Sequence, residues 1–448
     1  MAASSSVVDV SALIDRRITP FQLGIFVICF LIAAIDGVDS QAISVTGPMM
    51  VAEFHLSPHA LGPIFSAAQW GGLAGALLFG PCADRWGRRQ FLIACSVLCG
   101  AATLATPLAG SADSIFTLRA LAGFGFGGAS PCFVSLASEF APRRLRAGMV
   151  TIIWGALPGS GILNGLLGAF IVSDYGWRSI YYASGALTLV VAAVMLAWLP
   201  ESVSFMVTRG ADPARIRRIL LRLAPGSFDE SATRFVITEE TRAGAPVKHL
   251  FTEGRAAVTI LLWIAFFVDF FVLLATLIWT PGLLKLAGMP IAQASLALAI
   301  NNVGGVIGTV GIGQLIDRFP SHAVLALIFV LGAAVTASLG LAAPDFTAVA
   351  ILSAFAGFLV GGGGGGLIAL AALTYPTFMR STGIGWALGI SRFGSASGPL
   401  VVGFLVGAQW RPSAIFMMLA VIVLVVTVVL LAMGAHARAG RSVPAGAS

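Results

Sequence analysis

The chain has 448 residues, of which 58% are hydrophobic and only 10% charged, and its formal net charge is +7 at pH 7. Globular domains usually carry about 25% charged residues, so this composition excludes the soluble classes and leaves a polytopic membrane protein. The basic residues stand in short loops between apolar runs, where they set membrane orientation. The positive charge is therefore not a nucleic-acid-binding signature.

Twelve apolar runs are each long enough to cross a bilayer, which takes ~20 helical residues. We predict an all-α protein with spans at about 21–46, 59–81, 90–110, 114–137, 148–172, 177–199, 256–284, 291–315, 322–342, 346–372, 382–407 and 412–434. The predicted units are a tail (1–20), a first six-helix bundle (21–200), a central loop (201–255), a second six-helix bundle (256–435) and a tail (436–448). No cleavable signal peptide is expected, because the first run is too long for one.

The central loop contains ARIRRILLRL (214–223), a basic amphipathic pattern. We expect this helix to lie along the membrane surface; a plain soluble linker is the alternative. The two tails, the even-numbered loops and the central loop hold 21 of the 26 Lys and Arg residues. We expect the protein to lie in the inner (plasma) membrane. The positive-inside rule then places both termini in the cytoplasm.

The two halves of the chain repeat a loop pattern. GPCADRWGRR (80–89) follows the second span, and GQLIDRF (313–319) follows the eighth with the same Gly, Asp and Arg spacing 233 positions later. Pro142 and Arg146 recur as Pro376 and Arg380 at an offset of 234. Two parallel six-helix halves facing each other, with a substrate site between them near the midplane, are typical of a transporter.

These motifs resemble known families. Residues 80–89 resemble the loop 2–3 signature of the major facilitator superfamily, as do RALAGFGFGG (119–128) and LPES (199–202) in their positions. DGVDSQA (36–42) and YPTFMRSTGIGWALGISRFGSASGP (375–399) resemble the aromatic acid:proton symporter family. The resemblance implies uptake of aromatic carboxylates such as benzoate or hydroxybenzoates, driven by the proton gradient with no other cofactor.

Two carboxylates, Asp36 and Asp39, lie on one face of the first span because they are three residues apart. An intramembrane carboxylate is costly, so its default interpretation is functional, and these two match the family's D-G-x-D pattern. Arg119 lies about one turn into the fourth span from the outer face of the membrane, and Asp39 lies near that same membrane face. We expect an Asp39–Arg119 pair that breaks on protonation, or a static tether.

Asp269 stands in the seventh span, 233 residues after Asp36, so the two halves place a carboxylate at equivalent depth. It is a third candidate for proton coupling, because burial favours the neutral form of a carboxyl group. An ion-paired Asp269 that stays charged is the alternative, and the family resemblance gives this residue no support.

Arg392 lies ten residues into the eleventh span, roughly 15 Å deep. Its planar guanidinium matches a carboxylate, so we expect it to bind the substrate, with a permanent interhelical salt bridge as the alternative. An aromatic substrate needs flat apolar walls and partners for ring hydroxyls. The candidates are Trp279, Trp386, Phe393, Trp70 and Phe133 for the walls, and Gln69, Asn301 and Asn302 for hydrogen bonds.

Charged residues at the loop ends form a predicted gate that holds the outward-facing state. They are Asp84, Arg85, Arg88 and Arg89 with Asp317 and Arg318, joined by Glu139, Arg146 and Arg380. Arg143 and Arg144 are more simply solvated loop charges. Two glycine patterns indicate packing: small residues along 155–168 predict a face against the eighth span, and the six glycines at 361–366 predict close packing or bending of the tenth.

The main prediction is therefore a monomeric proton-coupled importer, with an aromatic carboxylate, protons and lipid as its partners. One rival is an efflux antiporter of the same fold, which is weakened because the antiporter Gly-Pro signature of the fifth span is reversed here as Pro158-Gly159. Another is a non-transporting sensor, although no segment is large enough for an added soluble domain. The sequence shows neither a nucleophile–base pair nor a cluster with metal-ligand spacing, so we expect neither an enzyme nor a metal site.

Overall fold

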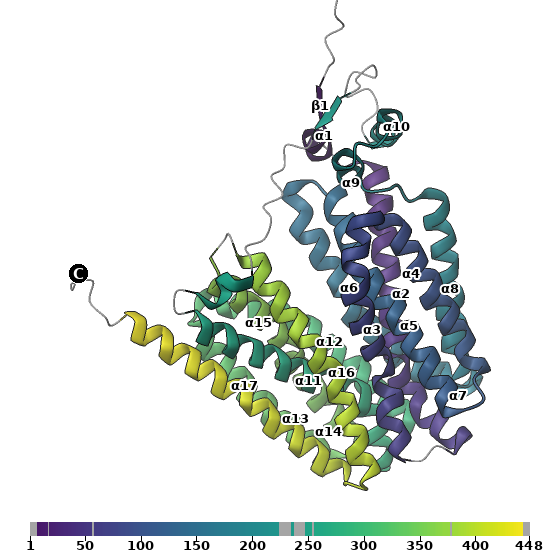
Figure 1. Ribbon diagram of the computed structural model, residues 1–448. Coiled ribbons are helices and arrows are strands. Elements are labelled where there is room, and N and C mark those ends of the chain that lie inside the picture. The colour runs from purple at the N-terminus through teal and green to yellow at the C-terminus, as the bar shows by residue number, and fades with distance from the viewer. Residues whose placement is uncertain are drawn as a thin grey trace, which may run out of the picture.

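A computed structural model describes residues 7–16, 18–55, 58–223, 234–236, 247–252, 255–376 and 379–441. Its long helices form two bundles (Figure 1). The first bundle contains α2 (Pro20–Phe54), α3 (Pro58–Trp86), α4 (Arg88–Ala105), α5 (Ala112–Phe140), α6 (Arg143–Phe170) and α8 (Arg178–Trp198). The second contains α11 (Ala256–Leu286), α12 (Ile291–Arg318), α13 (Ser321–Ala342), α14 (Phe346–Ala356) with α15 (Gly362–Thr374), α16 (Arg380–Gly407) and α17 (Pro412–Arg441).

The predicted all-α membrane architecture is confirmed. In the described residues, 11 helices are long and apolar enough to cross a membrane. They match eleven of the twelve predicted spans. The remaining span corresponds to α3, which is 29 residues long but less apolar because Pro63, Gln69 and several glycines interrupt it.

The tenth span is irregular just before its glycine run. A π-helical turn, η3 (Gly357–Gly361), separates α14 from α15. A Cβ on Gly362 would lie 2.5 Å from the backbone carbon of Gly308 on α12, so only glycine permits this approach. Close packing, one of the two predicted roles of residues 361–366, is thus present at Gly362, where the backbones of α12 and α15 come together.

The two bundles meet at one end and separate at the other (Figure 1). We call the end where α2 begins the terminal end and the opposite end the far end. At the far end α6 crosses α12 and α3 crosses α16 through small residues. A Cβ on Gly165 would lie 2.6 Å from the Ser295 backbone oxygen, and one on Gly62 would lie 2.9 Å from that of Leu400. The predicted packing face on the fifth span is confirmed in its far half.

Toward the terminal end, α6 leaves the second bundle. The ribbons of the two bundles diverge here (Figure 1), and Trp154 and Leu157, on the face of α6 that carries Gly161 and Gly165, are exposed. The structure is therefore closed at the far end and open at the terminal end. This conformation decides which charged groups can meet.

A small cap sits on the terminal end of the first bundle. It consists of α1 (Val10–Arg16), α9 (Val203–Thr208), α10 (Pro213–Leu223) and the parallel pair β1 (Val7–Asp9) and β2 (Arg234–Val236). The apolar residues Ile216, Leu220 and Leu223 of α10 are all buried against this cap and α2. The expectation that α10 lays its apolar face on the membrane surface is therefore wrong, because protein already covers that face.

Side chains of α2 and the loops fasten the cap. The Gln22 side-chain amide donates to the backbone oxygens of Ile14 at 3.2 Å and Phe140 at 2.9 Å. Asp15 accepts the Arg143 backbone N–H at 2.7 Å and pairs with its guanidinium at 3.3 Å. The Arg143 side chain remains exposed, as expected of a solvated loop charge, and also pairs with Asp15. The first part of the central loop, through α10, is thus anchored to the first bundle, whereas its last described part, η2 (Val247–Phe251), packs against α11 and α16 of the second.

The far-end contact predicts opposite effects of one substitution at two sites of α6. Gly155→Ala should stabilise the protein by about 0.5–1 kcal/mol, because alanine loses less backbone entropy in a helix. Gly165→Ala should destabilise it by about 1–3 kcal/mol, because the added methyl group meets backbone atoms that cannot move aside. Thermal unfolding of the detergent-purified variants measures both. Equal shifts of the same sign would contradict the close packing.

Candidate functional site

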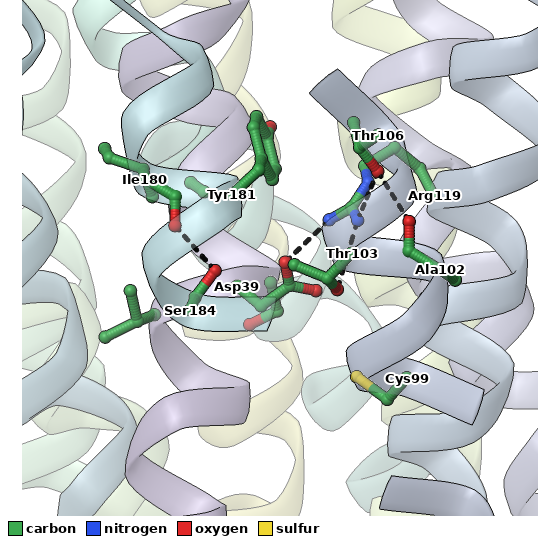
Figure 2. Close-up of polar contacts among 12 residues, drawn as sticks. Asp39, Cys99, Ala102, Thr103, Thr106, Arg119, Ile180, Tyr181 and Ser184 are labelled. Atoms are coloured by element: carbon green, nitrogen blue, oxygen red, sulfur yellow. Dashed lines mark hydrogen bonds and ion pairs between the residues drawn. The ribbon is translucent and has the colours of Figure 1, made fainter. Parts of the chain in front are cut away.

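A buried ion pair lies at the centre of the first bundle (Figure 2). Arg119 on α5 donates from Nη1 to Asp39 Oδ1 on α2 at 2.8 Å. Arg119 is 1% exposed and Asp39 is 6% exposed, so this pair is almost completely removed from solvent. The contact expected from the sequence is formed, and it holds the first and fourth spans together.

The rest of the Arg119 guanidinium is held by hydroxyl groups and a ring (Figure 2). Its Nη2 donates to Thr103 Oγ1 at 3.2 Å and to Thr106 Oγ1 at 2.8 Å, both near the end of α4. The guanidinium carbon lies 4.7 Å from the centre of the Tyr181 ring on α8. Tyr181 is itself oriented by a 2.9 Å hydrogen bond between its hydroxyl group and Thr46. Groups from three other helices therefore support this cation, which lowers the cost of burying it.

Asp36 lies one turn from Asp39 but lacks a comparable partner. It is 2% exposed, its Oδ1 accepts only the Cys99 thiol at 3.5 Å, and its Oδ2 has no partner in the described residues. Arg119 is already engaged by Asp39. An ionised Asp36 would thus be a second, uncompensated negative charge, whereas a protonated Asp36 fits the same place.

Asp269 on α11 is buried in the second bundle. It is 1% exposed, and neither carboxyl oxygen has a hydrogen-bond partner among the described residues. Its Oδ2 faces Gly364 of α15, where a Cβ would lie 2.8 Å away. The ion-paired alternative considered for Asp269 is not found in the described part of the chain, and Asp269 does not join the Asp39–Arg119 network.

Arg392 lies on α16 at the boundary between the two bundles. Its Nη2 donates to Ser130 Oγ on α5 at 3.3 Å, and Ser130 is 3% exposed. No carboxylate of the described residues forms an ion pair with this guanidinium. Arg392 is thus a partly buried cation whose hydrogen bond crosses from one bundle to the other.

The other predicted substrate residues fall into two groups. Trp279 is buried at the far end, where its Nε1–H donates to the Pro399 oxygen at 2.8 Å and its ring packs 4.4 Å from that of Phe65. Asn301 donates to the Ser353 oxygen at 3.2 Å, and Asn302 to the Leu298 oxygen at 3.0 Å. These groups are occupied by protein contacts in this conformation.

The side chains of the second group are more exposed, with the exception of Phe133. Trp386 is 44% exposed and stacks on Trp263, while Phe393, next to Arg392, is 42% exposed. Gln69 is partly buried and Trp70 is 38% exposed, both on α3, whereas Phe133 on α5 is buried. Of the predicted aromatic walls, Phe393 is the one placed directly beside Arg392 in the chain.

The predicted gate residues form a network within the first bundle. Glu139 pairs with Arg88 and accepts the Ser202 hydroxyl hydrogen. Arg89 donates to the backbone oxygens of Leu199 and Leu196, each at 2.6 Å. The signature loop after α3 is thereby joined to the LPES segment and to the end of α5.

The second copy of the gate pattern is separate in this structure. Asp317 and Arg318 are exposed, as are Arg85 and Arg380, and Arg380 donates to the Tyr375 oxygen at 3.5 Å. Arg146 is partly buried, and the Asp84 side chain lies outside the described residues. No ion pair joins Asp317 or Arg318 to the first bundle within the residues described. Their role in holding the outward-facing state stays a prediction.

The structure adds site residues that sequence reasoning missed. Thr103, Thr106 and Tyr181 surround Arg119, Cys99 contacts Asp36, and Ser130 contacts Arg392. One signal was available: Cys99, Thr103 and Thr106 are spaced by four and three residues, so they share a helical face. Their partners come from other helices, and no pattern within one helix identifies those.

Comparison with known proteins gives one consistent family. The model of the Major Facilitator Superfamily matches residues 29–387 and 292–447. The chain is 33% identical over 436 residues to the 4-hydroxybenzoate transporter PcaK of Pseudomonas aeruginosa, covering 96% of this chain and 97% of that protein. It is 34% identical over 441 residues to a gallate transporter of Pseudomonas putida, covering 98% and 97%. A benzoate transport protein of Acinetobacter baylyi is 32% identical over 404 residues, covering 88% and 86%.

Solved structures agree on the fold. The xylose transporter XylE from E. coli, in a partially occluded inward open conformation, superposes with a TM-score of 0.69 at 20% identity, covering 95% of this chain and 98% of that one. A bacterial homolog of the human lysosomal transporter Spinster gives a TM-score of 0.71 at 16% identity, with coverage of 95% and 98%. At these identities the likeness concerns the fold alone.

The buried pair predicts a specific pattern of stability. Asp39→Asn should destabilise the protein by about 3–5 kcal/mol, because it leaves the Arg119 charge buried without compensation. Arg119→Gln should cost a similar amount. The double variant should be less harmful than the sum of the two, because no unpaired charge remains. Thermal unfolding of the purified variants tests this. Strictly additive losses would show that the two side chains do not depend on each other.

Proposed function

Because this chain belongs to the major facilitator superfamily, we propose that it imports an aromatic carboxylate of the benzoate or hydroxybenzoate type by proton symport. It is a multi-pass membrane protein similar to aromatic acid transporters along almost its whole length. The observation that carries the substrate class is Arg392, a cation at the bundle boundary without a carboxylate partner among the described residues. The proposal requires no cofactor besides the proton gradient.

The substrate proposal follows from the chemistry of Arg392. A guanidinium presents two parallel N–H donors that fit a carboxylate, and the low dielectric of the membrane strengthens that contact. Ser130 occupies Nη2 from the other bundle at 3.3 Å, a long hydrogen bond that a carboxylate oxygen can replace. A substrate held there contacts both bundles. Binding would then favour states in which the bundles approach each other, as a transport cycle requires.

The proton-coupling proposal rests on the charge balance of α2. Asp39 and Arg119 neutralise each other, so the neighbouring Asp36 has no cation left to stabilise its ionised form. A proton entering at Asp39 removes the negative charge that faces Arg119 and weakens the contact between α2 and α5, whereas Asp36 fits this balance only in its protonated form. Releasing the proton restores it. The pair is therefore the proposed point where proton binding alters helix packing.

The closed far end and open terminal end support an alternating-access cycle. We place the terminal end, with both termini, in the cytoplasm of the inner membrane, since most basic residues lie there. The structure then represents an inward-open state of a monomer. In the outward-facing state, the gate network of the first bundle would contact Asp317 and Arg318 of the second bundle.

Proton symport is tested with purified protein in proteoliposomes. An acidic exterior should drive accumulation of labelled 4-hydroxybenzoate, and an uncoupler should abolish it. Asp36→Asn and Asp39→Asn should each lose accumulation, because neither can cycle a proton at that position. Exchange of labelled for unlabelled substrate should survive in at least one of them, since exchange needs no net deprotonation.

Gly155→Ala, which lies outside the ion-pair network, is the matched control and should accumulate substrate normally. Full accumulation by both aspartate variants would refute the coupling proposal. Outward movement driven by the same gradient would instead favour the rival antiporter.

Arg392 is tested by a charge-matched substitution. Arg392→Lys keeps the positive charge but loses the planar fork, so binding of 4-hydroxybenzoate should weaken severely, by about tenfold or more for a loss of 1.4 kcal/mol or more. Arg392→Ala should abolish binding. Isothermal calorimetry with the acid and with its amide, which lacks the carboxylate, separates two roles. An equal loss for acid and amide would make Arg392 a structural residue.

A further inference from the structure

We propose that Asp269 is a second proton-binding site, so that two protons accompany each carboxylate. This inference rests on the proposed symport function. It concerns a residue of the second bundle that the Asp36–Asp39–Arg119 network does not include, and it sets the electrical character of transport. Three features of the structure carry it: the isolation of the carboxyl group, the backbone against which it lies, and a small cavity beside it.

The first feature is isolation. Asp269 is 1% exposed, and both its carboxyl oxygens lack a hydrogen-bond partner among the described residues. An ionised carboxylate without a partner is strongly unfavourable in such a place, whereas the neutral acid is tolerated. The geometry therefore corresponds to the proton-bound form. A residue needed only for packing would not have to be acidic at this position.

No charged neighbour replaces the missing partner. The segments packed against α11 are α2, α12, α15, α16, α17, η3 and η2 (Val247–Phe251). Segments α15 and η3 carry no titratable side chain. The titratable or charged side chains described on the others are Cys29, Asp36, Asp39 and Glu53 of α2, Asp317 and Arg318 of α12, Arg380 and Arg392 of α16, His436 of α17, and Lys248 and His249 of η2. Neither these groups nor Lys285 of α11 itself forms a hydrogen bond or ion pair with Asp269 in the described part of the chain.

The second feature is the adjacent backbone. Asp269 Oδ2 lies 2.8 Å from the place that a Cβ on Gly364 would occupy, so a glycine there makes room for the carboxyl group. The π-helical turn η3 ends three residues earlier, at Gly361. Such turns occur often at functional sites and mark places where a helix can change its register. A charge that forms on Asp269 would thus act on the least regular part of the tenth span.

The third feature is a cavity of about 10 Å³ between α11, α12 and η3. Its lining includes Leu273, Thr276, Asn301 and Gly361. Leu273 lies one turn from Asp269 on the same face of α11, so the cavity begins one turn along the helix from the carboxyl group, which is not itself part of the lining. The volume is about that needed for one water molecule, and the Thr276 hydroxyl group lines it, whereas the Asn301 amide N–H already donates to the Ser353 oxygen. A polar cavity of the size of one water molecule thus lies near an otherwise apolar carboxyl site.

The internal repeat supplies independent support. Asp269 and Asp36 are 233 positions apart, the same offset as the two copies of the gate loop. Each bundle thereby holds one buried carboxyl group with an unpartnered oxygen at the equivalent place, within the residues that the structure describes. Two such groups, one for each bundle, match a stoichiometry of two protons. With a substrate of charge −1, two protons make each transport event carry one net positive charge, whereas one proton makes it electroneutral.

Electrical measurement on proteoliposomes tests the stoichiometry. The wild type should produce an inward positive current with 4-hydroxybenzoate, and an inside-negative potassium diffusion potential should accelerate uptake. Asp269→Asn keeps the size and neutrality of the protonated group but cannot cycle a proton. This variant should retain uptake driven by a pH gradient, lose the current, and no longer respond to the membrane potential.

Glycine variants provide matched controls. Gly364→Ala, which crowds the carboxyl group, should reduce the current relative to pH-driven uptake. Gly155→Ala on α6, outside this site, should not, because its Cβ would meet no neighbouring atom within 4 Å among the described residues. Electroneutral uptake by the wild type, or an unchanged charge-to-substrate ratio in Asp269→Asn, would overturn the inference while leaving one-proton symport intact. Absence of proton-coupled uptake by the wild type would instead remove the proposed function itself.

Discussion

The cost of burying charge in an apolar medium governs this structure. Arg119 of α5 is removed from solvent almost entirely, and three other helices supply the groups that compensate it: Asp39 from α2, Thr103 near the end of α4, and the Tyr181 ring from α8. Because a buried pair is tolerated only when both partners are well placed, the positions of these helices depend on one another. The same rule makes Asp36 and Asp269 notable, since each lacks such compensation among the described residues.

Glycine residues set how closely the two bundles approach each other. At the far end, Gly165 and Gly62 let helices of opposite bundles touch through their backbones. Toward the terminal end, the bundles diverge (Figure 1), and Trp154 and Leu157 on the corresponding face of α6 are exposed. The hydrogen bond from Arg392 to Ser130 lies between these regions of contact and separation. A group bound at Arg392 is thus well placed to affect how the bundles meet.

The terminal cap shows how easily one helical pattern supports two interpretations. The residues Ile216, Leu220 and Leu223 recur with helical spacing and predict an apolar face, which the structure confirms. Amphipathic periodicity does not say what covers that face. A membrane surface and a protein surface bury apolar area equally well, and here α1, α2 and β2 provide the cover. The N-terminal segment 7–16, expected to be a simple tail, is part of that cover.

The sequence by itself determined the helical membrane class, the two repeated halves and the identity of the intramembrane charges. Each of these follows from local composition or from spacing within one segment: apolar runs define spans, and charges inside them stand out. The pairing of Asp39 with Arg119 could also be anticipated, because depth in two spans can be counted. Only the tertiary structure decided that Asp36 and Asp269 lack partners among the described residues, that Ser130 contacts Arg392, and that Trp279 and Asn301 are occupied by protein contacts in this conformation. Those outcomes depend on distances between helices far apart in the chain and on which end of the bundles is closed, and neither is encoded in the period of any one helix.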